Sequence, residues 1–190
     1  LFEIPVTFRN LQRMSSYNYR QNRDEIQELL HQYDNLRSGR SHSFLEEEAF
    51  EKIIDYFDER EELLKALEAT GFAIERYPYS SSLLIKRADL LIAAKRYKES
   101  LQCLQQAELL DNSDINLYIL KTDAYLALDK QEKAAAVLEA ALDYFDGDEK
   151  LELLFELADV YDDYENFEKV FDCLKMVLEM DPNNEEALYK

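Results

Sequence analysis

The pattern of apolar and polar positions in residues 151–184 predicts two amphipathic helices joined by a short turn. Apolar residues recur at steps of 3, 1 and 3 in the first half and 3, 4 and 3 in the second. Such steps place side chains on one face of a helix. Tyr164 to Asn166 form the predicted turn, and Pro182 follows the second helix. The apolar positions are Leu154, Leu157, Ala158, Tyr161, Phe167, Val170, Leu174 and Val177.

This pattern occurs three more times towards the N-terminus, at intervals of 36, 34 and 34 residues. The position of Leu154 is taken in the earlier copies by Tyr118, Leu84 and Phe50. The small position of Val177 is taken by Ala141, Ala107 and Ala73. One helix pair cannot bury both of its faces, so it needs copies of itself on either side. We attribute the longer interval to a longer turn over residues 145–150.

Helix–turn–helix units with a period of 34 residues resemble the tetratricopeptide-repeat (TPR) family, over residues 47–190. The resemblance implies an all-α fold, a right-handed helix–turn–helix solenoid. Arg87 and Lys121 occupy the position that holds Leu157 in the last copy. We expect their stems to cover apolar surface while their charged ends reach water.

The expected organisation has three parts. Residues 1–23 form an irregular basic arm, which is either a flexible leader or a segment that lies against the acidic repeats. Residues 24–46 form a capping helix and turn, and a capping box at Ser43 to Glu46 starts the first repeat helix. The array then comprises residues 47–80, 81–114, 115–150 and 151–184, and residues 185–190 begin a fifth copy.

Charge limits the classes of partner. The chain carries 22 Lys and Arg against 41 Asp and Glu, a net charge of −19. Such a chain repels nucleic acid and anionic lipid surfaces, so we expect neither as a partner. No apolar run in the sequence approaches the length of a membrane span. Cys103 and Cys173 occupy one repeat position two copies apart, too distant for a disulfide, and indicate reduced thiols in the cytoplasm.

The sequence contains no motif for catalysis, a cofactor or a metal. Its two histidines, His31 and His42, are far from both cysteines, so no zinc-binding spacing exists. Only three glycines are present, which excludes the glycine-rich phosphate-binding loops. We therefore expect a protein that is not an enzyme and that binds no cofactor.

In the TPR family the first helices of successive pairs line a concave groove, and the resemblance implies the same here. All four repeats have aspartate at one position of that face, namely Asp55, Asp89, Asp123 and Asp159. Apolar residues at neighbouring positions are Ile85, Ile92, Ile119, Leu126 and Phe155. One interpretation is that each aspartate bridges adjacent helices or is simply solvated. The other is that this row of four aspartates recognises a ligand.

If the row recognises a ligand, it suits a peptide or protein segment that carries Lys or Arg beside apolar side chains. The sequence therefore indicates a non-enzymatic protein–protein interaction scaffold or adaptor. The alternative is a regulatory or sensor segment of a larger protein or enzyme. The face at the C-terminal end of the array is open to self-association.

Overall fold

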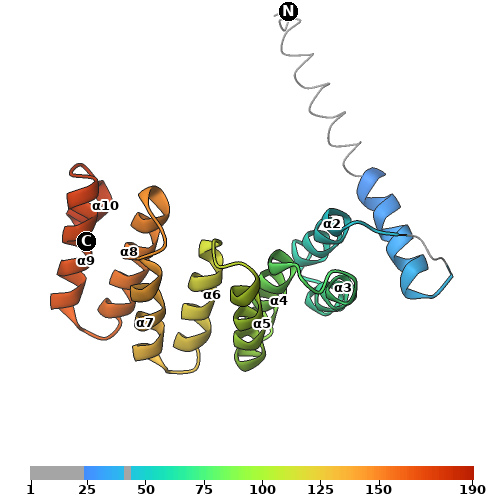
Figure 1. The fold of residues 1–190 in the computed structure, drawn as a ribbon, viewed down its shortest axis with the longest axis horizontal. Helices are drawn as coiled ribbons and strands as arrows, with labels where there is room; N and C mark the ends of the chain where they lie inside the picture. Colours follow the sequence, from blue (N-terminus) through green and yellow to red (C-terminus); the bar gives the residue numbers. More distant parts are fainter. Residues whose placement is uncertain (1–23, 41–43) are drawn as a thin grey trace, which may run out of the picture. The chain divides into compact units, whose positions relative to one another are not determined.

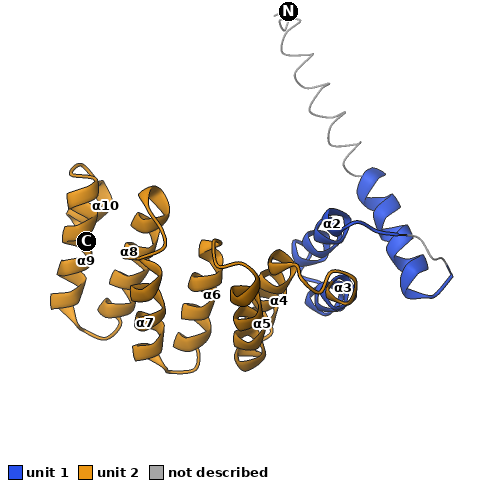
Figure 2. Ribbon diagram, in the orientation of Figure 1, with its two compact units in different colours: residues 1–73 blue, residues 74–190 orange. Residues whose placement is uncertain are grey.

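The computed structural model describes residues 24–40 and 44–190, and these residues form helices and turns without a strand. The chain divides into two compact units, residues 1–73 and residues 74–190, which Figure 2 distinguishes by colour. The predicted arm at residues 1–23 lies outside the described residues. The predicted all-α fold is confirmed. No helix in the described part of the chain is both long enough and apolar enough to span a membrane.

The first unit is held together around a buried tyrosine. Its elements are a helix over residues 24–37, α2 (Glu47–Asp58) and most of α3 (Leu63–Arg76). Tyr33, on the first of these helices, is 2% exposed. Its ring meets those of Phe50, Phe57 and Phe72 edge-on, at centroid distances of 6.4, 6.4 and 5.9 Å. The helix over residues 24–37 therefore covers the apolar side of α2 and α3.

Ser43, the first residue of the capping box predicted at Ser43 to Glu46, lies outside the described residues, but the helix begins later than that box predicts. α2 begins at Glu47, and its N-cap Glu46 makes no side-chain capping hydrogen bond. Leu45 lies outside the helix and is only 2% exposed. Burial of this leucine side chain outweighs the hydrogen bond that a cap would have supplied, since such a cap contributes only about 1 kcal/mol.

The second unit is a succession of antiparallel helix pairs, which can be followed from α4 to α10 in Figure 1. Each helix packs against the next along the chain, and the first helices of adjacent pairs also pack together. The helices are α4 (Ser81–Ala93), α5 (Tyr97–Leu110), α6 (Ile115–Leu126), α7 (Gln131–Ala141), α8 (Gly147–Asp162), α9 (Phe167–Met180) and α10 (Glu185–Tyr189).

The turn inside each pair has the same backbone conformation. One residue in each turn has a positive φ: Glu61 at 59°, Lys95 at 58°, Asp129 at 57° and Glu165 at 56°. The following amide then donates to a carbonyl five residues back, as from Arg96 to Leu91 at 2.7 Å. These residues are spaced 34, 34 and 36 apart, so the backbone repeats with the period of the apolar pattern.

Small side chains are frequent in the core of the second unit. Its core includes five alanines that are fully buried at 0% exposure. A methyl group at such a contact lets two helix backbones come close while the interior stays filled. The five residues are Ala88, Ala107, Ala134, Ala141 and Ala158.

The turn before the last repeat does not extend over residues 145–150, so that expectation is wrong: the turn covers residues 142–146 and is one residue longer than the turn over residues 111–114. α8 begins at Gly147 and contains 16 residues, against 12 in α6, so the extra residues extend the helix. Asp148 and Glu149 lie in the first turn of α8. Carboxylates there interact favourably with the positive end of the helix dipole, which favours the additional turn.

We expect Ala107→Leu and Ala141→Leu each to lower the free energy of unfolding by about 1–3 kcal/mol, because the added atoms overpack a filled contact. Urea unfolding measures the change. Ala140→Leu is the matched control, since Ala140 is the exposed neighbour of Ala141 on the same helix. Equal stability of all three variants would mean that these alanines do not set the helix spacing.

We expect Lys95→Gly to raise the free energy of unfolding by up to about 1 kcal/mol. A non-glycine residue in the left-handed conformation costs about 1–2 kcal/mol, which the substitution removes. The greater conformational freedom of glycine in the unfolded chain offsets part of this stabilisation. Gln106→Gly, inside α5, should instead lower stability by about 1 kcal/mol. Thermal melting of both variants tests the difference in sign.

Candidate functional site

Three of the four predicted aspartates lie on consecutive first helices of the second unit. Asp89 is on α4, Asp123 on α6 and Asp159 on α8, and all three side chains are exposed. α4 packs against α6, and α6 packs against α8. Asp55 lies on α2 in the first unit and is also exposed. The site described below therefore comprises residues of the second unit alone.

The carboxylates of these helices are close enough to affect one another's protonation. Partial burial, together with the charge of Asp89, raises the pKa of Asp123 above its ordinary value. Burial also raises the pKa of Glu156, with further contributions from Asp123 and Asp159. We call Asp89, Asp123, Glu156 and Asp159 the carboxylate cluster. Its members repel one another, so the cluster favours any cation that binds among them.

One cation of the chain itself occupies the end of the cluster. Lys190 forms an ion pair with Asp159, and its side chain is only 27% exposed. The same ammonium lies 5.9 Å from the centroid of the Phe155 ring, within the range of a cation–π contact. Its charge also lowers the pKa of Glu156, against the larger effects that raise it. A lysine side chain thus contacts a carboxylate and an aromatic ring at once.

The predicted apolar residues differ in how much surface they offer. Ile85 is 7% exposed and belongs to the core of the second unit. Ile92, Ile119, Leu126 and Phe155 are half-buried. Leu126 and Phe155 pack against the core while keeping part of their surface open. The apolar surface beside the carboxylates therefore comes from the four half-buried residues rather than from Ile85.

Sequence reasoning missed two residues of the site, Glu156 and Lys190. Glu156 precedes Asp159 by three positions on α8, a spacing that places two side chains on one helix face, so the sequence contained that signal. Lys190 follows α10, and its contact with Asp159 depends on how α10 packs against α9. No local spacing in the sequence indicates such a contact.

The described residues contain no group of three His, Cys, Asp or Glu side chains placed to hold a metal ion. Cys103 and Cys173 are free thiols. Burial raises the pKa of Cys103 and raises that of Cys173 to about 11. Both therefore remain protonated near neutral pH, when a thiol is a poor nucleophile.

Solved structures of TPR proteins have a similar fold. A thermophilic TPR protein of Thermus thermophilus, TTC0263, matches with a TM-score of 0.63 and 17% identity over 88% of this chain and 95% of its own. MamA from Desulfovibrio magneticus, from residue 41 to its end, matches with a TM-score of 0.65 and 16% identity over 87% and 96%.

YrrB, described as a TPR protein with an unusual peptide-binding site, matches with a TM-score of 0.57 and 17% identity over 74% of this chain and 72% of its own. No family model and no curated protein matches the sequence. At these identities the likeness establishes the fold. The binding partner has to be argued from the residues themselves.

We expect Asp123→Asn to stabilise the protein at neutral pH but not in acid. The raised pKa means that folding disfavours the ionised form of the Asp123 carboxylate. This penalty is present at pH 7, where the carboxylate is ionised. It is absent below about pH 4, where the carboxyl group is protonated in the unfolded chain as well. Because the side chain is exposed, the gain should stay below about 1 kcal/mol. Urea unfolding at pH 7 and pH 3 measures it.

Asp172→Asn, on α9, removes the same charge outside the cluster and is the control. A gain from Asp123→Asn that is the same at both pH values would show that the substitution acts on packing rather than on charge.

Proposed function

Since the chain has the tetratricopeptide-repeat fold, we propose that it is a non-enzymatic protein–protein interaction module. Its carboxylate cluster and the neighbouring apolar residues bind a peptide or protein segment that presents Lys or Arg beside apolar side chains. The contact of Lys190 with Asp159 and Phe155 carries this proposal, because it is the same recognition made within the chain.

The electrostatics of the cluster support a cationic partner. Asp123 and Glu156 have raised pKa values because neighbouring carboxylates add to the effect of their partial burial. A bound ammonium or guanidinium removes that repulsion and forms charge-assisted hydrogen bonds. Lys190 lies at the α8 end of the cluster, near Asp159, so we place the cation of the partner nearer to Asp123 on α6.

The apolar residues support a peptide rather than a free cation. Ile92, Ile119, Leu126 and Phe155 keep part of their surface open along the first helices. A segment with apolar side chains next to its basic residue can cover this surface while the charge reaches the carboxylates. YrrB, a TPR protein of similar fold described as having an unusual peptide-binding site, is consistent with such a use of the fold.

We expect the double substitution Asp89→Asn and Asp123→Asn to weaken binding of a basic peptide at least tenfold. The probe is an acetylated and amidated peptide with two lysines among leucines, titrated by fluorescence anisotropy. Binding by the parent protein should also weaken as salt rises, since 0.1 M salt screens charges beyond about 10 Å.

The control is Asp143→Asn with Asp172→Asn, which removes two charges elsewhere in the second unit. Equal loss of binding in both double variants would indicate attraction by net charge alone, and the proposed site would be wrong. Thermal melting of each variant separates lost binding from lost folding.

A further inference from the structure

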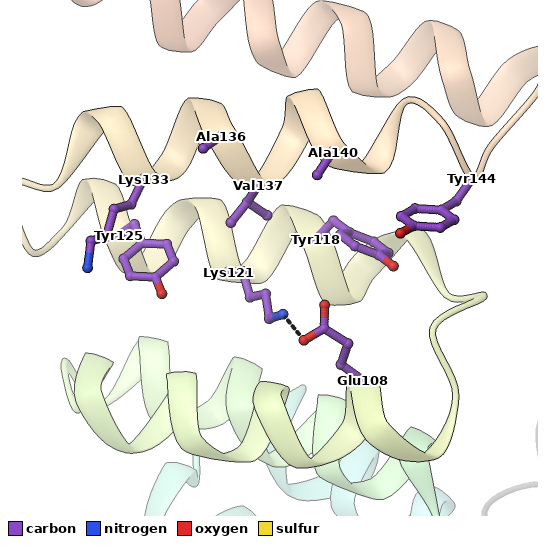
Figure 3. A pocket seen from close by; sticks show the side chains of 9 residues that line it. All are labelled: Glu108, Tyr118, Lys121, Tyr125, Lys133, Ala136, Val137, Ala140 and Tyr144. Carbon is purple, nitrogen blue, oxygen red and sulfur yellow. Dashed lines mark ion pairs between the residues drawn. The ribbon is translucent and has the colours of Figure 1, made fainter.

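A cavity of the same unit lies between α6 and the second helices α5 and α7. It has a volume of about 360 Å³ and is lined by residues of α5, α6 and α7, among them Tyr125 and Lys133, and by Tyr144 in the turn after α7 (Figure 3). An adjoining pocket of about 300 Å³ shares Tyr125 with it and also includes Gln105. No residue of the carboxylate cluster lines either pocket.

The next repeat contains a filled version of this site. Tyr161 of α8 donates a hydrogen bond to the carboxylate of Glu139 on α7. Lys169 of α9 donates to the Tyr161 hydroxyl at 2.7 Å and to Glu139 at 3.1 Å. Its ammonium also lies 4.5 Å from the centroid of the Tyr161 ring. A tyrosine and a lysine thus hold one carboxylate, and these bonds lower the pKa of Glu139.

The equivalent positions one repeat earlier keep the tyrosine and the lysine but lose the carboxylate. Tyr161 and Lys169 correspond to Tyr125 and Lys133, 36 residues back, and Glu139 corresponds to Gln105, 34 residues back. Lys133 still lies over the Tyr125 ring, at 5.9 Å from its centroid. Within the described part of the chain Lys133 forms no ion pair and the Tyr125 hydroxyl no hydrogen bond.

Smaller side chains leave this site open. Ala136 and Ala140 of α7 are exposed and line the cavity, where the corresponding residues of α9 are Asp172 and Met176. Val137 and Tyr144 add apolar wall to the same cavity. In Figure 3 these side chains border one space together with Tyr125 and Lys133.

The other charges of the cavity neutralise each other. Lys121 pairs with Glu108 at 2.6 Å, and its side chain is only 12% exposed, so our expectation that its charge reaches water is wrong. Its ammonium also lies 6.0 Å from the centroid of the Tyr118 ring. This pair replaces the apolar residues Leu142 and Leu157 of the next repeat. The charge that remains available in the cavity is therefore the ammonium of Lys133.

We propose that this cavity binds an acidic side chain of a partner protein, whose carboxylate contacts Tyr125 and Lys133 as Glu139 contacts Tyr161 and Lys169 in the next repeat. Tyr125 donates a hydrogen bond to that carboxylate, and Lys133 pairs with it. Apolar residues of the partner segment next to the acidic one pack on Val137 and Tyr144, where Ala136 and Ala140 leave room for its backbone. The chain then has two binding faces of opposite preference. The face on the first helices prefers a basic partner segment, and the cavity beside the second helices prefers an acidic one.

The first test supplies the missing carboxylate from the chain itself. Gln105→Glu should reproduce the neighbouring arrangement and raise the melting temperature above that of Gln106→Glu. The latter adds the same charge to the exposed surface of α5, one residue on. Nuclear magnetic resonance of the lysine side chains should show a raised pKa for Lys133 in Gln105→Glu only. Identical behaviour of the two variants would overturn the equivalence between the repeats.

The second test uses an acetylated and amidated peptide, Leu-Glu-Leu-Phe, with Leu-Gln-Leu-Phe as its neutral counterpart. We expect the acidic peptide to shift the resonances of Tyr125 and Lys133, with affinity roughly tenfold above that of the neutral peptide. Gln105→Glu and Lys133→Gln should abolish this preference, while Gln106→Glu should retain it.

Glutarate serves as a free dicarboxylate in the same titration. Affinity for glutarate equal to that for the acidic peptide would overturn the assignment to a protein segment. Equal shifts with the two peptides, or no shift at these residues with any of the three probes, would overturn the site itself.

Discussion

The second unit depends on one packing constraint, namely that each helix pair has an apolar face which only the next pair can cover. Buried alanines set how closely the helices approach, and a left-handed residue in each turn sets where the second helix starts. Because both features recur with the same spacing, each pair presents its neighbour with nearly the same surface. The order of charged residues along the solenoid then follows directly from their order in the sequence.

This regularity explains how a chain with a net charge of −19 tolerates carboxylates on three adjacent helices. The backbone positions are fixed by apolar packing, so repulsion among Asp89, Asp123 and Asp159 cannot separate the helices. Instead it adds to the effect of burial, which is the larger cause of the raised pKa values of Asp123 and Glu156. Apolar packing thus holds mutually repelling carboxylates close together, and a cation that binds among them relieves the repulsion. Such groups with shifted pKa values are common at binding surfaces.

The fold and the helix faces could be predicted from the sequence because a periodic apolar pattern is local and repeated. Predictions failed where one local signal competed with burial or with a distant partner. α2 begins later than the capping signal predicted, and Leu45 before it is buried. Lys121 pairs with Glu108 on another helix instead of reaching water. Lys190 could not be assigned to the carboxylate cluster, because its partner Asp159 lies 31 positions away in the sequence.

Repeats also allow one part of the molecule to serve as the reference for another. Tyr161, Lys169 and Glu139 show what a tyrosine and a lysine do at this position when a carboxylate is present. Tyr125 and Lys133 occupy the equivalent positions, and Gln105 stands where the next repeat has Glu139, so that pocket lacks the carboxylate. A lone exposed lysine on a helical protein would carry no such argument. Here the comparison is made within one chain, at the same backbone positions, and it identifies the missing group as a carboxylate.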